Sequence, residues 1–144
     1  MKIKDLRIRT IALCLIKNEK QIFVFEGYDS VKDETFYRPL GGGIEFGETA
    51  EEAAIREIQE EMGTEIEKVS YLTTFENIFI CDGKPGHEIV LLMSASFKDK
   101  SYYIKDNIRC NENGVPFTSM WVSTQEFISG NKILYPEGLT KFLT

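Results

Sequence analysis

Histidine and cysteine are scarce in this chain of 144 residues, which contains one histidine, His87, and three cysteines. Cys14, Cys81 and Cys110 are odd in number, lie far apart and lack the paired spacing of a zinc site. This scarcity argues against both a zinc centre and a disulfide framework. Unpaired thiols fit a reducing compartment, so we expect a cytoplasmic protein.

Long hydrophobic runs are also missing. The apolar run Ile11–Ile16 ends at Lys17 and is too short to span a membrane. The charged segment before it carries no signal-peptide cleavage pattern. No repeat, low-complexity tract or linker is visible. We therefore expect no membrane partner and a single domain over residues 1–144, which is long enough to bury a sizeable core.

Positive charge is in deficit, because 17 lysines and arginines oppose 23 aspartates and glutamates, for a net charge of −6. The whole excess falls in Gly41–Gly63, GGGIEFGETAEEAAIREIQEEMG, where seven glutamates oppose one basic residue, Arg56. The acidic balance argues against sequence-independent binding to nucleic acid, which needs a basic face. The acidic balance is compatible with the binding of phosphorylated small molecules if a metal ion mediates the contact. A segment with this composition is suited to holding cations.

The predicted elements follow the order strands, helix, strands, helices. The polar stretch Gly27–Thr35 is expected to be a loop and Lys98–Gly114 a mobile excursion. A short helix is expected from Ser123 to Gly130, and a last helical segment after Pro136. This order predicts an α/β or α+β domain with helices packed on a mixed sheet. The strand-like runs are Arg7–Ile16, Gln21–Phe25, Phe36–Arg38, Ser70–Ile80, Glu88–Phe97 and Pro116–Val122.

One long helix is predicted from Thr49 to Met62, directly after the glycine-rich loop. Thr49 suits the N-cap, Glu52 completes a capping box, and Gly63 suits the position after the last turn. Alanines strengthen the helix, and Ala54, Ile58 and Met62 form an apolar stripe that can dock on the sheet.

Three carboxylates share one face of that helix, since Glu60 and Glu61 lie within about 60° of Glu57 around its axis. The Glu57 and Glu61 pair costs roughly 0.2–0.5 kcal/mol of helix stability, and negative charge in the last turn costs roughly 0.3–1 kcal/mol per group. Such local conflicts are expected at functional sites, although a solvated helix face would show the same run of charge. A divalent cation would reverse both penalties, and donors that are all oxygen favour Mg²⁺ or Mn²⁺ over zinc.

The segment from Gly42 to Thr64 resembles the Nudix box of the Nudix hydrolase family. Gly42, Glu48 and the run Arg56-Glu57-Ile58-Gln59-Glu60-Glu61-Met62-Gly63 match the spacing of this 23-residue pattern. Thr64 departs from the aliphatic residue that is usual in the last place, which is a packing position. The resemblance implies an α/β/α sandwich around a mixed β-sheet, with the helix at about 49–62 and the C-terminal helices packed on it.

The resemblance also implies a reaction, the hydrolysis of a nucleoside diphosphate linked to another moiety by water attack on phosphorus. By carry-over, Glu57, Glu60 and Glu61 ligate Mg²⁺ with help from the Gly42 carbonyl. Arg56 pairs with Glu48 and holds the loop against the helix.

The general base varies within the family, and the candidates here are Glu60 and Glu61 in the box and Glu88 and Glu76 outside it.

The candidate substrate contacts are Arg38, Glu45 and His87. Glu45 is expected beside the metal cluster and His87 at a turn. The aromatic residues that could stack on a base are Phe25, Tyr28, Phe46, Phe79 and Trp121.

The substrate within this class stays open. A proline about fifteen residues past the box, usual in members acting on ADP-ribose, is replaced by Ile78 or Phe79. No tyrosine of the dinucleoside polyphosphate type lies between Tyr71 and Tyr102. A nucleotide sugar, ADP-ribose and a nucleoside triphosphate remain candidates. The alternative function is a catalytically silent Nudix-fold sensor that binds nucleotides. The family often forms dimers, and no residue here selects or excludes a homodimer.

Overall fold

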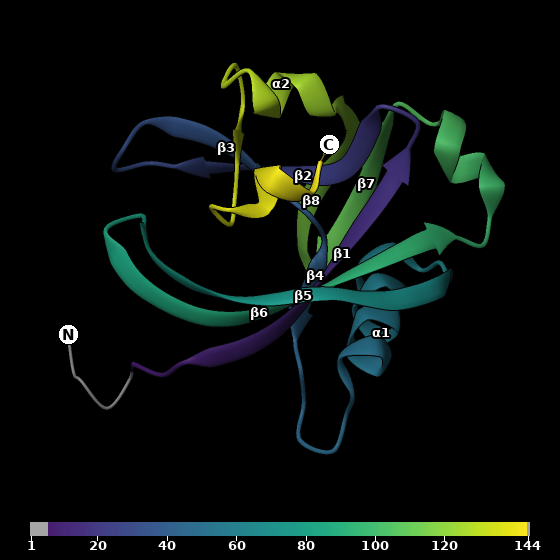
Figure 1. The fold of residues 1–144 in the computed structure, drawn as a ribbon, viewed down its shortest axis with the longest axis horizontal. Helices are drawn as coiled ribbons and strands as arrows, with labels where there is room; N and C mark the ends of the chain where they lie inside the picture. Colours follow the sequence, from purple (N-terminus) through teal and green to yellow (C-terminus); the bar gives the residue numbers. More distant parts are fainter. Residues whose placement is uncertain (1–5, 144) are drawn as a thin grey trace.

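The computed structural model describes residues 6–143 as a mixed β-sheet with helices on both sides (Figure 1). The expected mixed sheet with packed helices is therefore confirmed. Its strands are β1 (Arg9–Asn18), β2 (Gln21–Asp29), β3 (Glu34–Arg38), β4 (Gly41–Gly43), β5 (Ile66–Cys81), β6 (Lys84–Phe97), β7 (Asn107–Glu112), β8 (Val115–Ser123) and β9 (Ile133–Leu134). The helices are α1 (Ala50–Met62) and α2 (Thr124–Ile128), with the 3₁₀ segments η2 (Lys100–Ile104) and η3 (Leu139–Phe142).

Strand β1 lies at the centre of the structure. It runs parallel to β6 on one side, pairs antiparallel with β4 on the other, and meets β2 only at the hairpin formed by Lys17 and Asn18. Every residue of Ile11–Ile16 is buried. Alternate side chains of this run enter two different hydrophobic clusters, one beneath α1 and one beneath α2 and η3. A strand that is covered on both faces needs apolar side chains at every position, which explains the continuous apolar run Ile11–Ile16.

Helix α1 has the expected ends. The Thr49 hydroxyl accepts a hydrogen bond from the Glu52 amide, the Glu52 carboxylate accepts one from the Thr49 amide, and Gly63 ends the helix in the left-handed conformation. Ala53, Ala54 and Ile58 are fully buried against the sheet. The small alanine side chains let the helix axis approach β1 closely, which brings the last turn of α1 over the strand.

The prediction of a mobile excursion over Lys98–Gly114 is wrong. Segment η2 is anchored because the Tyr103 hydroxyl accepts a hydrogen bond from the Phe97 amide and the Tyr102 carbonyl accepts one from the Trp121 indole. Strand β7 then pairs with β8 along its whole length and packs beside α1. β7 buries only Ile108 and Cys110, so its sequence is mostly polar and does not indicate a strand. A two-residue turn, Asn113-Gly114, closes the hairpin with positive φ at both residues, as this dipeptide favours.

The hairpins extend further than their sequences indicate. Residues of the predicted loop Gly27–Thr35 continue β2 and β3 in register to the pair Asp29 and Glu34. The β5–β6 hairpin is paired up to its Asp82-Gly83 turn, and β5 carries two register shifts near its start. Figure 1 shows this long hairpin curving beneath the β2–β3 hairpin.

The C-terminal helical segments are shorter than expected. Ser123 caps α2 through the Gln125 amide, and the segment after Pro136 forms only the short turn η3. Phe127, Leu139 and Leu143 nevertheless bury their side chains in the cluster on that side of the sheet. Within residues 6–143, no helix combines the length and the apolar character needed to cross a membrane.

Hydrogen exchange distinguishes an ordered β7 from a mobile loop. We expect the β7 amides bonded to β8 to exchange at least about a hundredfold more slowly than those of the Asn113-Gly114 turn, because they open only with the hairpin. Two-dimensional NMR after transfer to D₂O measures these rates. Uniformly fast exchange across residues 107–112 would contradict an ordered β7 and support the prediction of a mobile segment.

Candidate functional site

Arg56 connects the glycine-rich loop to helix α1. Its Nε and Nη2 donate to the two carboxylate oxygens of Glu48 at 2.7 and 2.9 Å, and Nη2 also donates to the Gly43 carbonyl at 2.9 Å. Nη1 donates to Glu57 Oε1 at 2.9 Å. The guanidinium hydrogen bonds lower the pKa of Glu48 to about 2, so the pair is ionised at neutral pH. The pairing of Arg56 with Glu48, implied by the resemblance, is present in this geometry.

Gly42 and Glu57 are packed against each other. A Cβ atom added to Gly42 would lie 2.4 Å from the carboxyl carbon of Glu57 and 2.5 Å from its Oε2. The Glu57 carboxylate therefore rests directly on strand β4 in a space that only glycine leaves open. Burial raises the pKa of Glu57, while Arg56 lowers it, and neighbouring Glu60 and Glu112 raise it further.

Glu61 is a buried carboxylate with an unsatisfied oxygen. The residue is 7% exposed, and its Oε1 has no hydrogen-bond partner among residues 6–143. Burial first, and then the charges of Glu57, Glu112 and Glu60, raise the pKa of Glu61 to about 8. Buried polar atoms in folded proteins are almost always partnered, so this oxygen marks a place where a partner is expected.

These features fit a divalent cation. The unsatisfied Glu61 oxygen, the Glu57 carboxylate on Gly42 and the mutual repulsion of the carboxylates all favour a bound positive charge. The donors are oxygens, which Mg²⁺ and Mn²⁺ prefer. Among residues 6–143, no three His, Cys, Asp or Glu side chains already enclose a metal position. Instead, Arg56 engages Glu57 and Glu60, and Glu45 lies 3.8 Å from its Nη1.

A cavity of about 610 Å³ opens in front of Gly42 and Glu61. Glu112, at the end of β7, lines this cavity and lies close enough to raise the pKa of both Glu57 and Glu61. Glu112 is not among the site residues predicted from the sequence, because Lys98–Gly114 was expected to be a mobile excursion. The Asn113-Gly114 turn was the signal that could have revealed it. Phe25 and Phe117 form one wall, with their ring centroids 5.4 Å apart.

Glu88 lines the same cavity, but its carboxylate is already engaged. Its Oε1 accepts hydrogen bonds from Arg38 Nη2 at 3.0 Å and from Asn77 Nδ2 at 3.1 Å. Its Oε2 lies 4.0 Å from Arg9 Nη1. Glu88 is 4% exposed, so these groups compensate a buried charge.

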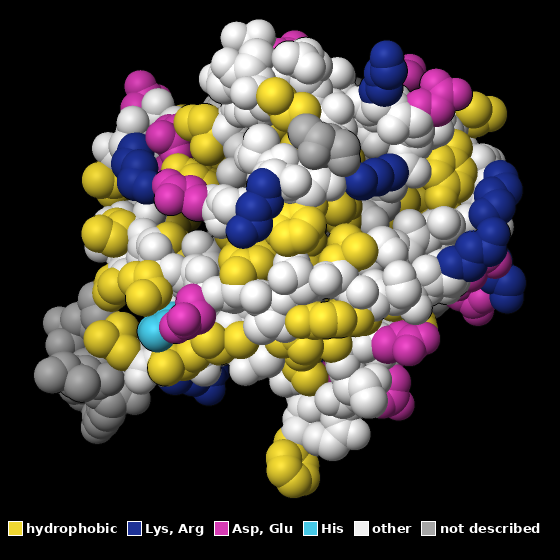
Figure 2. Space-filling view, viewed as in Figure 1, with side chains coloured by type: hydrophobic (Ala, Val, Ile, Leu, Met, Phe, Trp, Pro, Cys, Tyr) yellow, Lys and Arg dark blue, Asp and Glu magenta, His cyan; other side chains and the backbone are white. Residues whose placement is uncertain are grey.

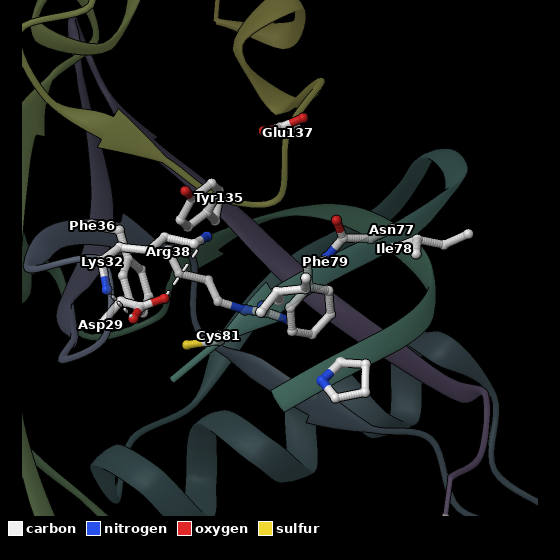
Figure 3. A pocket seen from close by; sticks show the side chains of 12 residues that line it. Asp29, Lys32, Phe36, Arg38, Asn77, Ile78, Phe79, Cys81, Tyr135 and Glu137 are labelled. Carbon is white, nitrogen blue, oxygen red and sulfur yellow. Dashed lines mark hydrogen bonds and ion pairs between the residues drawn. The ribbon is translucent and has the colours of Figure 1, made fainter. Parts of the chain in front are cut away.

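A second cavity of about 590 Å³ adjoins the first, and both are lined by Phe36 and Arg38 (Figure 3). It lies between the β2–β3 and β5–β6 hairpins, whose tips are joined because Asp82 Oδ1 accepts hydrogen bonds from the amide and hydroxyl of Ser30 at 2.8 and 2.9 Å. Figure 2 shows hydrophobic side chains gathered on this face of the molecule. The residues around the second cavity include Asp29, Lys32, Ile78, Phe79, Pro85 and Tyr135.

The other candidates from the sequence lie outside the two cavities. Glu60 and Glu45 are exposed, at 58% and 71% of their side-chain areas, although Arg56 is near both. Glu76 is exposed on β5 beside the buried Asn77, so its side chain points to the opposite face of the strand. His87 lines a neighbouring groove that also contains Leu6 and Ile8 and shares Arg9 and Glu88 with the first cavity.

The aromatic candidates divide in the same way. Phe25 lines the first cavity and Phe79 the second. Tyr28 and Phe46 are exposed. Trp121 packs against Phe23 and Tyr103 and belongs to the core. Two of the five aromatic candidates are therefore placed where a substrate ring could reach them.

Solved structures with the same fold support this architecture. A Nudix hydrolase from Nitrosomonas europaea matches with a TM-score of 0.64 at 13% identity, covering 95% of this chain and 86% of the other. A MutT protein from Bacillus halodurans matches at 0.63 and 14% identity, with coverages of 94% and 79%. A MutT Nudix hydrolase from Burkholderia pseudomallei matches at 0.59 and 19% identity, with 95% of each chain covered.

The family itself follows from the sequence match. A family model described as the NUDIX domain matches residues 6–141, which covers nearly the whole chain and includes the loop, the helix and both cavities. The Nudix family generally uses divalent metal ions and acts on small nucleotide substrates. The chain therefore belongs to the NUDIX family.

Proposed function

We propose that the enzyme cleaves the pyrophosphate bond of a nucleoside diphosphate linked to another moiety, by water attack on phosphorus and with Mg²⁺ or Mn²⁺ as cofactor. The observation that carries this proposal is the buried oxygen of Glu61 beside Glu57, which has no hydrogen-bond partner among residues 6–143, at a cavity that Arg9 and Arg38 also line. Carboxylates and guanidinium groups on one cavity suit a metal ion and a diphosphate, respectively.

Glu57, Glu61 and the backbone of Gly42 would hold the metal, with the exposed Glu60 able to turn toward it. The metal would neutralise the diphosphate and acidify the attacking water. Arg56 keeps the Glu57 carboxylate on strand β4 and fixes the loop through Glu48. Its role is to orient the ligands, as groups behind a metal site commonly do.

Glu112 joins Glu60 and Glu61 as a candidate for the general base. It is exposed, lines the cavity and lies near the buried carboxylates. A base must reach the water that it deprotonates, directly or through one other water. Glu88 meets this requirement less well because both of its oxygens already face cationic or amide donors.

The substrate would lie across the boundary of the two cavities. Arg38 and Arg9, which line the first cavity together with Glu61, supply positive charge for phosphate oxygens. The second cavity offers the rings of Phe36, Phe79 and Tyr135 to a base or another apolar group. Nucleotide sugars, ADP-ribose and nucleoside triphosphates all combine a diphosphate with a ring and remain the substrate candidates.

A hydrolysis screen tests the proposed function directly. Purified enzyme should be incubated with nucleoside triphosphates, ADP-ribose, nucleotide sugars and dinucleoside polyphosphates, in Mg²⁺ and in EDTA. We expect turnover that EDTA abolishes and that Glu61→Gln lowers by about a hundredfold or more, because a metal ligand and its charge are lost. Chromatography of the products measures it. Activity that persists in EDTA would refute the metal requirement.

Substitution of neighbouring glycines separates the site from the fold. We expect Gly42→Ala to lower kcat by about a hundredfold, since its methyl group would displace the Glu57 carboxylate, and misplacement of this size is costly in catalysis. Gly43→Ala is the matched control, because within the described part of the chain its Cβ would meet only Arg9 Nη2, at an ordinary van der Waals distance of 3.5 Å. Steady-state kinetics should therefore show activity near wild type in the control. Equal losses in the two variants would count against the metal-site assignment.

The metal-free enzyme should lose stability as pH rises. The ordinary pKa of 4.5 for Glu61 rises to about 8 in the folded chain. Between these values the unfolded chain releases this proton and the folded chain keeps it, so the free energy of unfolding falls as pH rises. We expect Tm in EDTA to fall by several degrees between about pH 5 and about pH 8.

The same experiment carries its own control. Glu61→Gln should flatten this part of the pH profile, because glutamine does not titrate. Mg²⁺ should raise Tm more at high pH than at low pH, since it competes with the proton for the carboxylate. Differential scanning calorimetry measures both effects. A profile that is the same in the wild type and in Glu61→Gln would contradict the assignment.

A further inference from the structure

The contacts of Glu88 point to a role other than proton transfer. One oxygen accepts hydrogen bonds from Arg38 and Asn77, at 3.0 and 3.1 Å, and the other faces Arg9 at 4.0 Å. The oxygen that accepts from Arg38 and Asn77 has little capacity left for a water, and the positive charge of Arg9 lies across from the other oxygen. The group is 4% exposed and lies on β6 directly opposite Arg9 of β1 in the parallel register.

The Glu88 carboxylate is engaged, whereas most of the hydrogen-bonding capacity of Arg38 is unused. A guanidinium has five N–H donors in a fixed plane. Among the described residues, this side chain makes one hydrogen bond, from Nη2 to Glu88. The side chain is 18% exposed and lines both cavities, and Figure 3 shows it between Phe36 and Phe79. Its remaining donors are available to a ligand that spans the boundary.

We propose that Glu88 is a positioning residue, whose buried carboxylate fixes Arg38, with Arg9 beside it, as the anchor for a phosphate group at the boundary of the two cavities. This inference rests on the proposed function. The Arg38 side chain has several rotatable bonds, and ordering it before the substrate arrives removes part of the entropic cost of binding. Asn77 prevents the carboxylate from turning away, because it donates to the same oxygen as Arg38.

The positioning role and the base role predict opposite kinetics. Loss of an anchor weakens substrate binding and raises KM, whereas loss of a general base lowers kcat by about 10²–10⁴-fold. We expect Glu88→Ala to raise KM by about tenfold or more, as loss of a charge-assisted contact does, while kcat stays within about threefold. Glu88→Gln should be milder, because its amide oxygen can still accept from Arg38 and Asn77.

A double-mutant cycle with Arg38→Ala tests whether Glu88 acts through Arg38. We expect Glu88→Ala to add little to KM once Arg38 has been removed, because the two residues form one unit. Val90→Ala is the matched control, since Val90 is fully buried two residues along β6 and on the same face. It should lower Tm without changing KM.

Three results would overturn the proposal. A large fall in kcat with KM unchanged in Glu88→Ala would identify Glu88 as the base. A rise in KM that Val90→Ala reproduces at equal loss of Tm would reduce Glu88 to a structural residue. Additive effects of the Glu88 and Arg38 substitutions would show that Glu88 acts independently of Arg38.

Binding measurements separate a failure of this proposal from a failure of the proposed function. Isothermal titration with inorganic pyrophosphate and Mg²⁺ does not depend on turnover. We expect both Glu88→Ala and Arg38→Ala to weaken pyrophosphate binding by about tenfold, and Val90→Ala to leave it unchanged. This pattern in an enzyme that hydrolyses none of the screened substrates would support the anchor while rejecting the reaction. Equal affinity in all variants would reject the anchor even if hydrolysis is confirmed.

Discussion

The guanidinium of Arg56 is the contact on which the acidic site depends. It is the only basic group in a segment with seven glutamates, and it touches Glu48, the Gly43 carbonyl and Glu57 at once. A flexible ammonium group could not satisfy three directions in one plane, so lysine would be a poor replacement. The position of the loop relative to α1, and hence of Gly42 relative to Glu57, follows from this contact.

The burial of the carboxylates follows from the packing beneath them. Ala53 and Ala54 bring α1 close to β1, so the last turn of the helix lies over Cys14. Burial raises the pKa of the Cys14 thiol to about 12, and the charges of Glu61 and Glu57 contribute to this shift. The thiol therefore stays neutral beneath the carboxylates. A larger residue at either alanine would push the helix away from the sheet and expose Glu61 to water. Water would then hydrogen-bond to the Glu61 oxygen that now has no partner in the described chain.

Local chemistry explains which parts of the fold could be predicted from the sequence. Helix α1 is encoded by its own capping residues, Thr49 and Gly63, and these need no tertiary information. Strand β7 depends on β8 and α1 for its stability, and its own residues are mostly polar. The sequence therefore revealed the helix and concealed the strand that carries Glu112. The same limit applies to Glu88, whose partners Arg38, Asn77 and Arg9 come from three other strands. From the sequence, Glu88 is a candidate general base just after a turn. The donors that surround its carboxylate become visible only in the fold.

The distribution of charge within the first cavity favours one form of the substrate in the proposed function. Glu61 and Glu112 line this cavity together with Arg38 and Arg9. In the proposed function, a metal ion would engage the carboxylates and a diphosphate the arginines. A metal–diphosphate complex would offer both kinds of side chain a partner of opposite charge. A preference for this complex would be a property of the whole cavity, because Arg9, Arg38 and Glu112 lie outside the Gly42–Thr64 box.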